Sequence, residues 1–203
     1  MKRILIVLTG LVVAAALAAC ASTAGQGGWV SLIDGNNGLD NFDRVGDANW
    51  RAEGNAVVAD QAKVGSFLVS KNSYKNFQLR AEFWADHTTN SGIFIRLSDA
   101  KTVTAANSYE VNIYDQRPDP LYGTGAIVDF AKVSPMPKAG GKWNNYLITA
   151  TDGRIVVELN GVQTVDLRDS KFASGPVALQ FANGPKDAPG GAIKWRSVQI
   201  KPI

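Results

Sequence analysis

Residues 144–167 read NNYLITATDGRIVVELNGVQTVDL, and their pattern gives the first indication of the fold. Apolar and polar residues alternate along it, which is the two-residue period of a strand buried on one side. Asp152-Gly153 and Asn160-Gly161 interrupt the alternation, and both dipeptides favour the tight turns that join antiparallel strands. The stretch therefore predicts a meander of three antiparallel strands.

Short alternating runs of this kind, separated by turn residues, recur along the chain. No segment carries the sustained 3.6-residue apolar period of a helix. Further strands are predicted in NWRAEGNAVVAD (49–60), NFQLRAEFWAD (76–86), SGIFIRLSD (91–99), SYEVNIYD (108–115), GPVALQFAN (175–183) and GAIKWRSVQIKP (191–202). About a dozen strands in one domain fit a jelly roll. The sequence therefore predicts an all-β, antiparallel jelly-roll sandwich of two sheets, with no helix longer than about two turns.

The N-terminal segment has the features of a targeting signal. Lys2 and Arg3 form a basic start, and the apolar run Ile4–Ala19 follows. The run ends in Leu17-Ala18-Ala19-Cys20, which resembles a bacterial lipobox, where the cysteine is lipidated. A membrane-spanning helix needs roughly 20 apolar residues, more than this run has, and a plain secretory signal leaves the cysteine unexplained.

These features divide the chain into three parts. We expect a lipoprotein signal peptide at residues 1–19, a lipidated Cys20 with a flexible tether up to residue 28, and one jelly-roll domain at 29–203. Ala21, directly after the cysteine, resembles the sorting pattern of outer-membrane lipoproteins. The expected location is the bacterial cell envelope, where the lipid anchors the domain at the outer membrane or facing the periplasm.

The charge balance excludes one class of partner. The chain has 21 basic and 18 acidic residues, and loss of Lys2 and Arg3 with the signal leaves 19 basic residues. A mature chain this close to neutrality lacks the basic excess of a nucleic-acid-binding protein. Cys20 is the only cysteine, so no disulfide is expected in the domain.

The strands predict a second, polar face opposite the apolar one. In TNSGIFIRLSD (89–99), Ile93, Ile95 and Leu97 share one face, which leaves Arg96 on the other. The same alternation places polar, charged or aromatic side chains opposite the core at Arg80, Glu82, Trp84, Phe94, Glu110, Asn112, Tyr114 and Gln180. Aromatic rings beside hydrogen-bonding groups suit the recognition of sugars. A solvated face with salt-bridged charges is the alternative that the pattern leaves open.

Six blocks of sequence, in chain order, resemble the 3-keto-disaccharide hydrolase domain family. They are SLIDGNNGLDNF, FLVSKNSYKNFQLRAEFWADHTTNSGIFIRLSD, SYEVNIYD, GTGAIVDF, GKWNNYLITATDGRIVVELNG, and GPVALQFAN with the later IKWRSVQIKP. The resemblance extends from about Trp29 to Pro202 and implies a concanavalin A-like jelly roll whose concave sheet carries the site. It also implies a carbohydrate substrate already oxidised at C3, and hence a sugar 3-oxidoreductase upstream in the pathway.

The resemblance implies cleavage by elimination. A ketone at C3 acidifies the C2–H bond, so a carboxylate can remove that proton, the glycosidic oxygen leaves C1, and water adds afterwards. Glu110 matches the acidic position of the SYEVNIYD block and is the expected base, with Asp115 as a second carboxylate, acid or metal ligand. We expect Arg96 to contact the substrate oxygens and to stabilise the enolate. The remaining expected substrate-binding residues are Glu82, Trp84, Asn112, Tyr114, Gln180 and Asn183.

One position departs from the family pattern. Many relatives carry a histidine soon after the dipeptide that corresponds to Leu179-Gln180, where this chain has Asn183. Asparagine can hydrogen-bond but cannot transfer protons, so the change puts hydrolysis in doubt and leaves binding intact. His87, the only histidine, is expected to be a surface turn residue, and no transition-metal site is predicted. A divalent cation held by Glu82, Glu110 and Asp115 is an open option.

Three functions follow from these observations. The first is a hydrolase or eliminase acting on 3-keto-glycosides, and the second is a non-catalytic carbohydrate-binding envelope lipoprotein. The third is a structural lipoprotein whose polar face docks another protein. A conventional glucanase fits less well, because such enzymes carry acidic residues at alternating strand positions, whereas Glu110 is followed by Asn112 and Tyr114.

Overall fold

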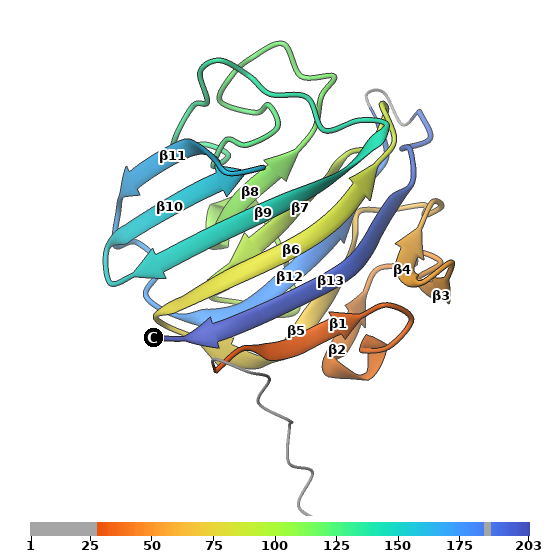
Figure 1. The fold of residues 1–203 in the computed structure, drawn as a ribbon, viewed down its shortest axis with the longest axis horizontal. Coiled ribbons are helices and arrows are strands. Elements are labelled where there is room, and N and C mark those ends of the chain that lie inside the picture. The colour runs from red at the N-terminus through yellow and green to blue at the C-terminus, as the bar shows by residue number, and fades with distance from the viewer. Residues whose placement is uncertain (1–27, 185–187) are drawn as a thin grey trace, which may run out of the picture.

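A computed structural model of the chain describes residues 28–184 and 188–203. These residues form two β-sheets packed face to face, as Figure 1 shows. The eight-stranded sheet contains β1 (Val30–Asp34), β3 (Arg51–Glu53), β4 (Ala56–Ala59), β6 (Phe77–Ala85), β9 (Lys142–Thr151), β10 (Arg154–Leu159), β11 (Val162–Arg168) and β13 (Ile193–Pro202). The five-stranded sheet contains β2 (Phe42–Val45), β5 (Ser66–Tyr74), β7 (Ser91–Ile95), β8 (Tyr109–Ile113) and β12 (Gly175–Phe181). The predicted all-β, two-sheet jelly roll is confirmed.

Helical structure in the described part is limited to two three-residue 3₁₀ turns, η1 (Leu39–Asn41) and η2 (Ala105–Asn107). The expectation of no helix longer than two turns is therefore confirmed for these residues. None of their helices has the length and apolar character needed to cross a membrane. The predicted signal peptide, Cys20 and most of the tether lie outside the described residues, so they stay predictions.

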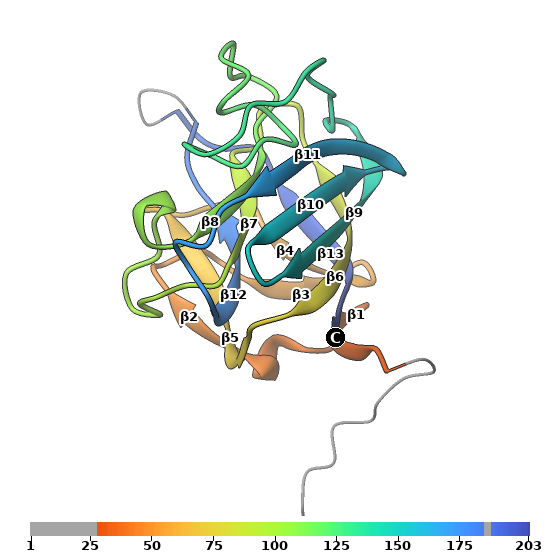
Figure 2. The same cartoon turned by 90° about the vertical axis from the view of Figure 1, so that its left-hand side faces the viewer.

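The strand order is antiparallel and interleaves distant segments. The larger sheet runs β11-β10-β9-β6-β13-β4-β3, with β1 also paired to β13, and the smaller one runs β2-β5-β12-β7-β8. β6 and β7 follow each other in the chain yet belong to opposite sheets, which Figure 2 shows from the side. Because the chain crosses between sheets here, residues of β6 and β7 that are near each other in the sequence lie in different sheets.

The predicted meander is present as β9, β10 and β11. Its two turns use backbone in the left-handed region, with φ of 45° at Asp152 and 54° at Asn160. Aspartate and asparagine tolerate this region better than most side chains, which is why these dipeptides predicted the turns. The pairing of β10 with both neighbours confirms the meander.

The core lies between the sheets and follows the predicted alternation. In β6, Phe77, Leu79, Ala81 and Phe83 are buried, whereas the residues between them keep contact with solvent. Across the sandwich, Ile93, Val111 and Leu179 of the five-stranded sheet are fully buried in the same cluster. Burial of this apolar surface is the main force that holds the two sheets together.

The alternation fails at the end of β7. Arg96 has a left-handed φ of 55°, so its side chain turns inward, and Leu97 joins a small hydrophobic cluster outside the main core. Gly175 permits this bend, because a Cβ atom at Gly175 would lie 2.0 Å from the Leu97 carbonyl oxygen. The expected core position of Leu97 and the expected outward position of Arg96 are therefore both wrong.

The outer face of the five-stranded sheet is only partly open. Phe67, Val69, Phe94, Leu97, Val103 and Ala178 form the small cluster that covers part of it. Phe94 was expected on the polar face, but its ring is buried and meets the Phe67 ring edge-on at 5.3 Å. The part of this face around Glu110 stays polar, and it contains the candidate site.

Candidate active site

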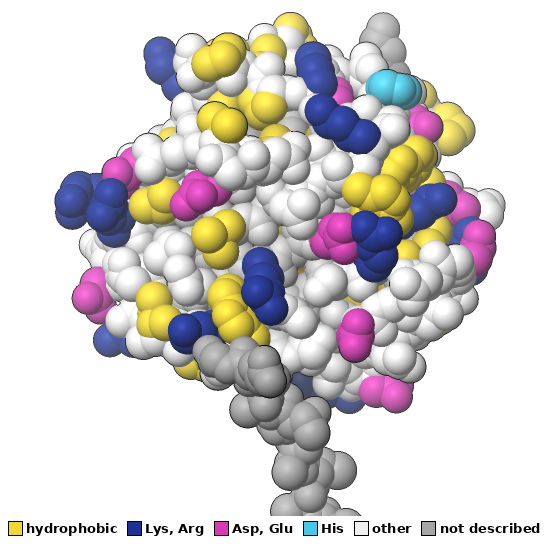
Figure 3. All heavy atoms as spheres, viewed as in Figure 1, with side chains coloured by type: hydrophobic (Ala, Val, Ile, Leu, Met, Phe, Trp, Pro, Cys, Tyr) yellow, Lys and Arg dark blue, Asp and Glu magenta, His cyan; other side chains and the backbone are white. Residues whose placement is uncertain are grey.

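The predicted polar residues do not share one face. Glu82 and Trp84 lie on β6, on the outer face of the eight-stranded sheet, whereas Glu110 lies on β8 of the other sheet. Glu82 accepts a bidentate contact from the Arg196 guanidinium, and the Lys194 ammonium lies 4.8 Å from the centre of the Trp84 ring. Figure 3 shows this outer face, where charged and hydrophobic side chains lie side by side. The expectation that Glu82, Arg96 and Glu110 share a ligand is wrong, because the sheets separate them.

Arg96 is a structural residue in the interior of the sandwich. Its guanidinium donates hydrogen bonds to the carbonyl oxygens of Lys75 (2.7 and 3.0 Å), Asp152 (2.6 Å) and Phe172 (3.3 Å). The side chain is fully buried, and burial lowers the pKa of the Arg96 guanidinium. Arg96 ties together three loops at one end of the sandwich, so its predicted contact with substrate is not supported.

A polar pocket of about 200 Å³ lies on the outer face of the five-stranded sheet. Strands β8 and β12 provide its floor, and the segment that follows β8 provides its wall. The lining residues are Asn90, Glu110, Asn112, Tyr114, Arg117, Tyr122, Val128 and Gln180. Four of the predicted residues, Glu110, Asn112, Tyr114 and Gln180, therefore do lie together.

Among the described residues, Glu110 is the only carboxylate in the lining of this pocket. Protein surrounds it closely, although the side chain keeps partial contact with solvent through the mouth of the pocket. Burial, together with the negative charge of Asp129 and against the positive charge of Arg117, raises the pKa of Glu110 to about 8. Among the described residues, no group donates a hydrogen bond to the Glu110 carboxylate, which is therefore free to act on a ligand.

Gly92 creates the space beside this carboxylate. It lies opposite Asn112 in the pairing of β7 with β8, and its missing side chain leaves room above the sheet. A Cβ atom at Gly92 would lie 3.3 Å from Glu110 Oε1 and 3.1 Å from the Val111 carbonyl oxygen. Any larger residue at this position would crowd the Glu110 carboxyl.

The two amides of the pocket floor differ in their bonding. Asn112 is committed to the protein, because its Nδ2 donates to the Tyr122 carbonyl oxygen at 2.6 Å and its Oδ1 accepts from the Ile113 amide at 3.0 Å. Gln180 is not, because its buried Oε1 has no hydrogen-bond partner in the described part of the chain. Leaving a buried oxygen unpaired costs free energy, so Gln180 is suited to accept a bond from a ligand hydroxyl.

Asn183 takes part through its backbone. Its carbonyl oxygen accepts a hydrogen bond of 2.7 Å from Nδ2 of Asn90, and Asn90 lines the pocket. The Asn183 side chain is not part of the lining. The predicted contact of this side chain with substrate is therefore not supported, and Asn90 is the asparagine that the sequence analysis missed.

Asp115 supports a loop and lies outside the pocket lining. Its carboxylate accepts hydrogen bonds from Thr124 Oγ1 at 2.6 Å and from the amides of Ala139 and Gly140 at 3.0 and 2.8 Å. Because these donors occupy the carboxylate, the predicted role of Asp115 as catalytic acid or metal ligand is not supported. His87 packs against the same loop, since a Cβ atom at Gly140 would lie 2.7 Å from His87 Nδ1.

Arg117, Tyr122 and Asp129 were not predicted from the sequence. The Arg117 guanidinium lies 5.3 Å from the centre of the Tyr114 ring and 5.5 Å from that of Tyr122, and the Tyr122 hydroxyl donates to Asp129 Oδ1 at 2.7 Å. All three belong to the segment after β8, where no regular period places a side chain. The only available signal was the concentration of charged and aromatic residues between positions 114 and 130.

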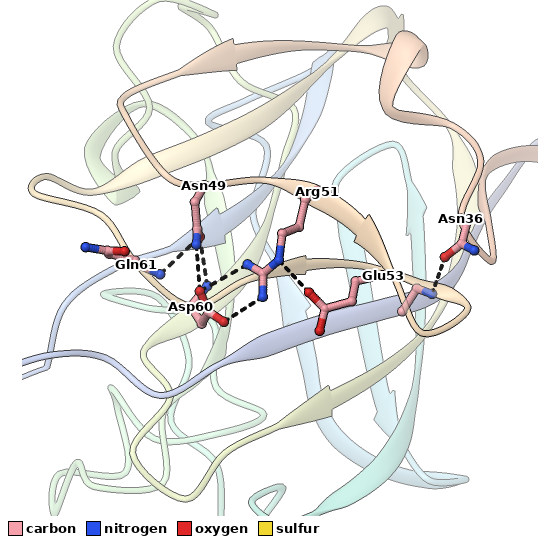
Figure 4. A network of polar contacts seen from close by, with 7 residues as sticks. Asn36, Asn49, Arg51, Glu53, Asp60 and Gln61 are labelled. Carbon is pink, nitrogen blue, oxygen red and sulfur yellow. Dashed lines mark hydrogen bonds and ion pairs between the residues drawn. The ribbon is translucent and has the colours of Figure 1, made fainter.

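Two other charged groups pair within the protein. A hollow of about 680 Å³ on the eight-stranded sheet contains Glu82, which is already paired with Arg196, and Glu158. Figure 4 shows a second closed network, in which Arg51 bonds to Glu53 at 2.6 Å and to Asp60 at 2.8 Å. A hollow of about 990 Å³ between β1 and β5 has no aspartate or glutamate among the described residues that line it.

The proposed cation set is not assembled. Glu82, Glu110 and Asp115 are separated by the sheets and by the bonds described above. Within residues 28–184 and 188–203, no group of three or more histidine, cysteine, aspartate or glutamate side chains is arranged to hold a metal ion.

Comparison with known structures supports the fold. The chain is similar to a candidate glycosyl hydrolase from Parabacteroides distasonis, with 23% identity, a TM-score of 0.68, and coverage of 86% of this chain and 99% of that one. It is also similar to the carbohydrate-binding module CBM66 from Bacillus subtilis, with 15% identity, a TM-score of 0.59, and coverage of 86% and 95%. No curated protein matches the sequence.

A family model gives the relationship directly. The model of the 3-keto-alpha-glucoside-1,2-lyase-like domain matches residues 28–201, which include every strand described above except the last residue of β13. The resemblance noted in the sequence is thereby confirmed. The chain belongs to the 3-keto-alpha-glucoside-1,2-lyase-like domain family.

Proposed function

We propose that the chain cleaves glycosides that carry a ketone at C3, with Glu110 as the base. The observation that carries this proposal is the Glu110 carboxyl itself, which is enclosed, free of hydrogen-bond donors among the described residues, and open to a small polar pocket. A base needs a pKa near the working pH, and the pKa of about 8 at Glu110 meets this condition. The family relationship supports the choice of substrate class.

The chemistry requires one base and one stabilised anion. The Glu110 carboxylate takes the proton from C2, the C–H electrons form a C2=C3 bond, and the C3 carbonyl oxygen becomes negative. When the C3=O bond re-forms, the electrons move to a C1=C2 bond and the glycosidic oxygen leaves C1 and takes up a proton. Water then adds across C1=C2, which completes the hydrolysis.

The pocket also limits the substrate by size. Its volume of about 200 Å³ lies below the roughly 300–1,000 Å³ of pockets that enclose drug-sized ligands. We infer that it holds one sugar ring, and that the second sugar of a disaccharide extends toward solvent. Gln180 Oε1 is placed to accept a bond from a hydroxyl of the enclosed ring.

The direct test offers the protein a 3-keto-disaccharide and its unoxidised parent side by side. We expect sugar release from the keto compound only, because the parent has no acidic C2–H bond. Deuterium at C2 should slow the release wherever proton removal limits the rate. Release from the unoxidised parent at an equal rate would contradict the proposal.

The alternative is a non-catalytic carbohydrate-binding function. It is favoured by the absence of a histidine at Asn183 and by the unpaired Gln180 oxygen, which suits binding without chemistry. Tight binding of the keto sugar with no release would establish this alternative and exclude catalysis.

A further inference from the structure

Arg117 has an unusual position in the pocket. Its guanidinium lies against the rings of Tyr114 and Tyr122, with distances of 5.3 and 5.5 Å to the ring centres. None of the ion pairs in the described part of the chain includes Arg117. The side chain is exposed, so its N–H donors are available to a molecule that enters the pocket.

The rings that hold Arg117 are themselves fixed. The Tyr122 hydroxyl donates to Asp129 Oδ1 at 2.7 Å, and the Tyr122 carbonyl oxygen accepts from Asn112 Nδ2 at 2.6 Å. Tyr114 is buried, and its amide donates to Thr124 Oγ1 at 2.9 Å. A guanidinium resting on two fixed rings loses little further freedom when it binds a ligand, which favours recognition.

Asp129 lies beside this arrangement. Its backbone has a left-handed φ of 65°, a region that aspartate tolerates better than most residues other than glycine. Asp129 accepts a hydrogen bond from the Tyr122 hydroxyl and forms no ion pair with Arg117. The Arg117 guanidinium is therefore available to another anion.

We propose that Arg117 is the anion-binding residue of the pocket, and that it stabilises the negative oxygen at C3 when Glu110 removes the C2 proton. This inference rests on the proposed function for the identity of the anion. It assigns to Arg117 the task that the sequence had placed on Arg96. No covalent bond to Arg117 forms or breaks, because the guanidinium acts through charge and N–H donors.

The same geometry defines a wider class of ligand. A planar guanidinium binds planar anions in a bidentate manner, and the neighbouring Glu110 carboxyl does not repel them while it is protonated. We therefore expect a small planar dianion to bind in the absence of turnover. Oxalate is a suitable probe, because its two carboxylates resemble the oxygens of an enediolate.

The experiment compares Arg117→Met and Arg117→Lys with wild type in the full chain. We expect Arg117→Met to lower the turnover of a 3-keto-disaccharide roughly 100-fold to 1,000-fold, the usual cost of losing one oxyanion donor. Arg117→Lys should recover part of the turnover, because it keeps the charge without the planar fork. Arg154→Met, which breaks an exposed ion pair with Asp166 on the other sheet, is the matched control and should leave turnover unchanged.

Two further readings separate binding from a structural role. Oxalate affinity, measured by calorimetry, should fall at least about tenfold in Arg117→Met, which is about 1.4 kcal/mol. The pH midpoint of Glu110, followed by the NMR signal of its carboxyl carbon, should move upward from about 8, because Arg117 lowers the pKa of Glu110. A purely structural residue would move neither reading in a folded variant.

The outcomes distinguish this inference from the proposed function. Unchanged turnover and unchanged oxalate affinity in Arg117→Met would overturn the role of Arg117 and leave the function of Glu110 standing. Oxalate binding that depends on Arg117, with no release from any 3-keto-glycoside, would support the anion site and reject the catalytic proposal. If Arg117→Met does not fold, full oxalate affinity and turnover in Arg117→Lys would also overturn the inference.

Discussion

The outer face of the eight-stranded sheet and the pocket on the five-stranded sheet both contain a glutamate near an arginine and aromatic rings. The glutamate is paired with the arginine on the first and unpaired in the second. On the first, Glu82 is bonded to Arg196, and the Arg80 and Arg196 guanidiniums rest on Trp29 and Trp143 at 4.4 and 4.1 Å. In the pocket, Arg117 lies close enough to lower the pKa of Glu110 but forms no ion pair with it. Residue type alone therefore does not mark the site, whereas an enclosed carboxylate without a protein partner does.

The difference has a structural cause. β13 shifts register between Trp195 and Ser197, and Arg196 reaches Glu82 on the neighbouring strand β6 from this irregularity. Among the described residues, no cation forms an ion pair with Glu110, and its cross-strand neighbour on β7 is Phe94. Glu82 is therefore paired within its own sheet, whereas Glu110 remains available to a ligand.

The largest expected effect tests this difference with two matched substitutions. Glu110→Gln removes the base and preserves shape, so turnover of a 3-keto-disaccharide should fall roughly 100-fold to 10,000-fold. Glu82→Gln makes the same chemical change at the half-buried pair with Arg196 on the other sheet and should leave turnover within about twofold, because Glu82 does not line the pocket. Steady-state kinetics of both variants provides the comparison.

One result would move the candidate active site from Glu110 to Glu82. Full activity in Glu110→Gln together with a large loss in Glu82→Gln would place the reaction on the outer face of the eight-stranded sheet. The folded state of both variants should be checked by far-UV circular dichroism before the rates are compared.

The next effect concerns Arg96, a buried arginine whose guanidinium is hydrogen-bonded to backbone carbonyl oxygens. Arg96→Met would leave the carbonyl oxygens of Lys75, Asp152 and Phe172 without their donor, and each unpaired buried group costs about 1–3 kcal/mol. We expect the free energy of unfolding to fall by about 3 kcal/mol or more. Arg154→Met breaks an exposed ion pair and should cost about 0–1 kcal/mol.

Urea unfolding of the two arginine variants measures this contrast. Equal stabilities would show that the bonds of Arg96 contribute no more than a surface ion pair. Because Arg96 lies outside the pocket lining, the folded fraction of Arg96→Met should retain its affinity for oxalate.

A third effect is the pH dependence of stability, which should have opposite signs in the two regions. Folding raises the pKa of Glu110 from its ordinary 4.5 to about 8, so its protonated form is favoured in the folded state. That contribution is fully present below pH 4.5 and is lost as the pH rises to about 8. Arg196 lowers the pKa of Glu82, so its contribution is present at neutral pH and is lost in acid.

Melting temperatures across a pH series measure both contributions. Relative to wild type, Glu110→Gln should gain stability as the pH rises from about 5 to 8, and Glu82→Gln should lose its disadvantage below about pH 4. A flat difference between Glu110→Gln and wild type over this range would show that Glu110 titrates as an ordinary surface carboxyl.

Most of the fold could be predicted from the sequence, and only part of the site. The strands and turns follow from local alternation and from dipeptides such as Asn160-Gly161, which act over a few residues. Glu110, Asn112, Tyr114 and Gln180 were identified because they alternate regularly with core residues on β8 and β12 or directly after β8. Arg117, Tyr122 and Asn90 were missed because they lie outside regular strands.

Local alternation and turn dipeptides were enough to establish that the chain forms an all-β sandwich, which residues of its regular strands face the core, and that Glu110 lies on the polar side of its strand. Which polar residues meet depended on the packing of the two sheets. Alternation reports the side of a strand but not the sheet to which the strand belongs, so it could not separate Glu82 from Glu110. Alternation also could not predict the left-handed backbone at Arg96, which directs the Arg96 side chain into the interior. Nor could it predict that a loop places Arg117 at the pocket. Both outcomes depend on contacts between residues far apart in the chain, and such contacts form only when the sheets pack.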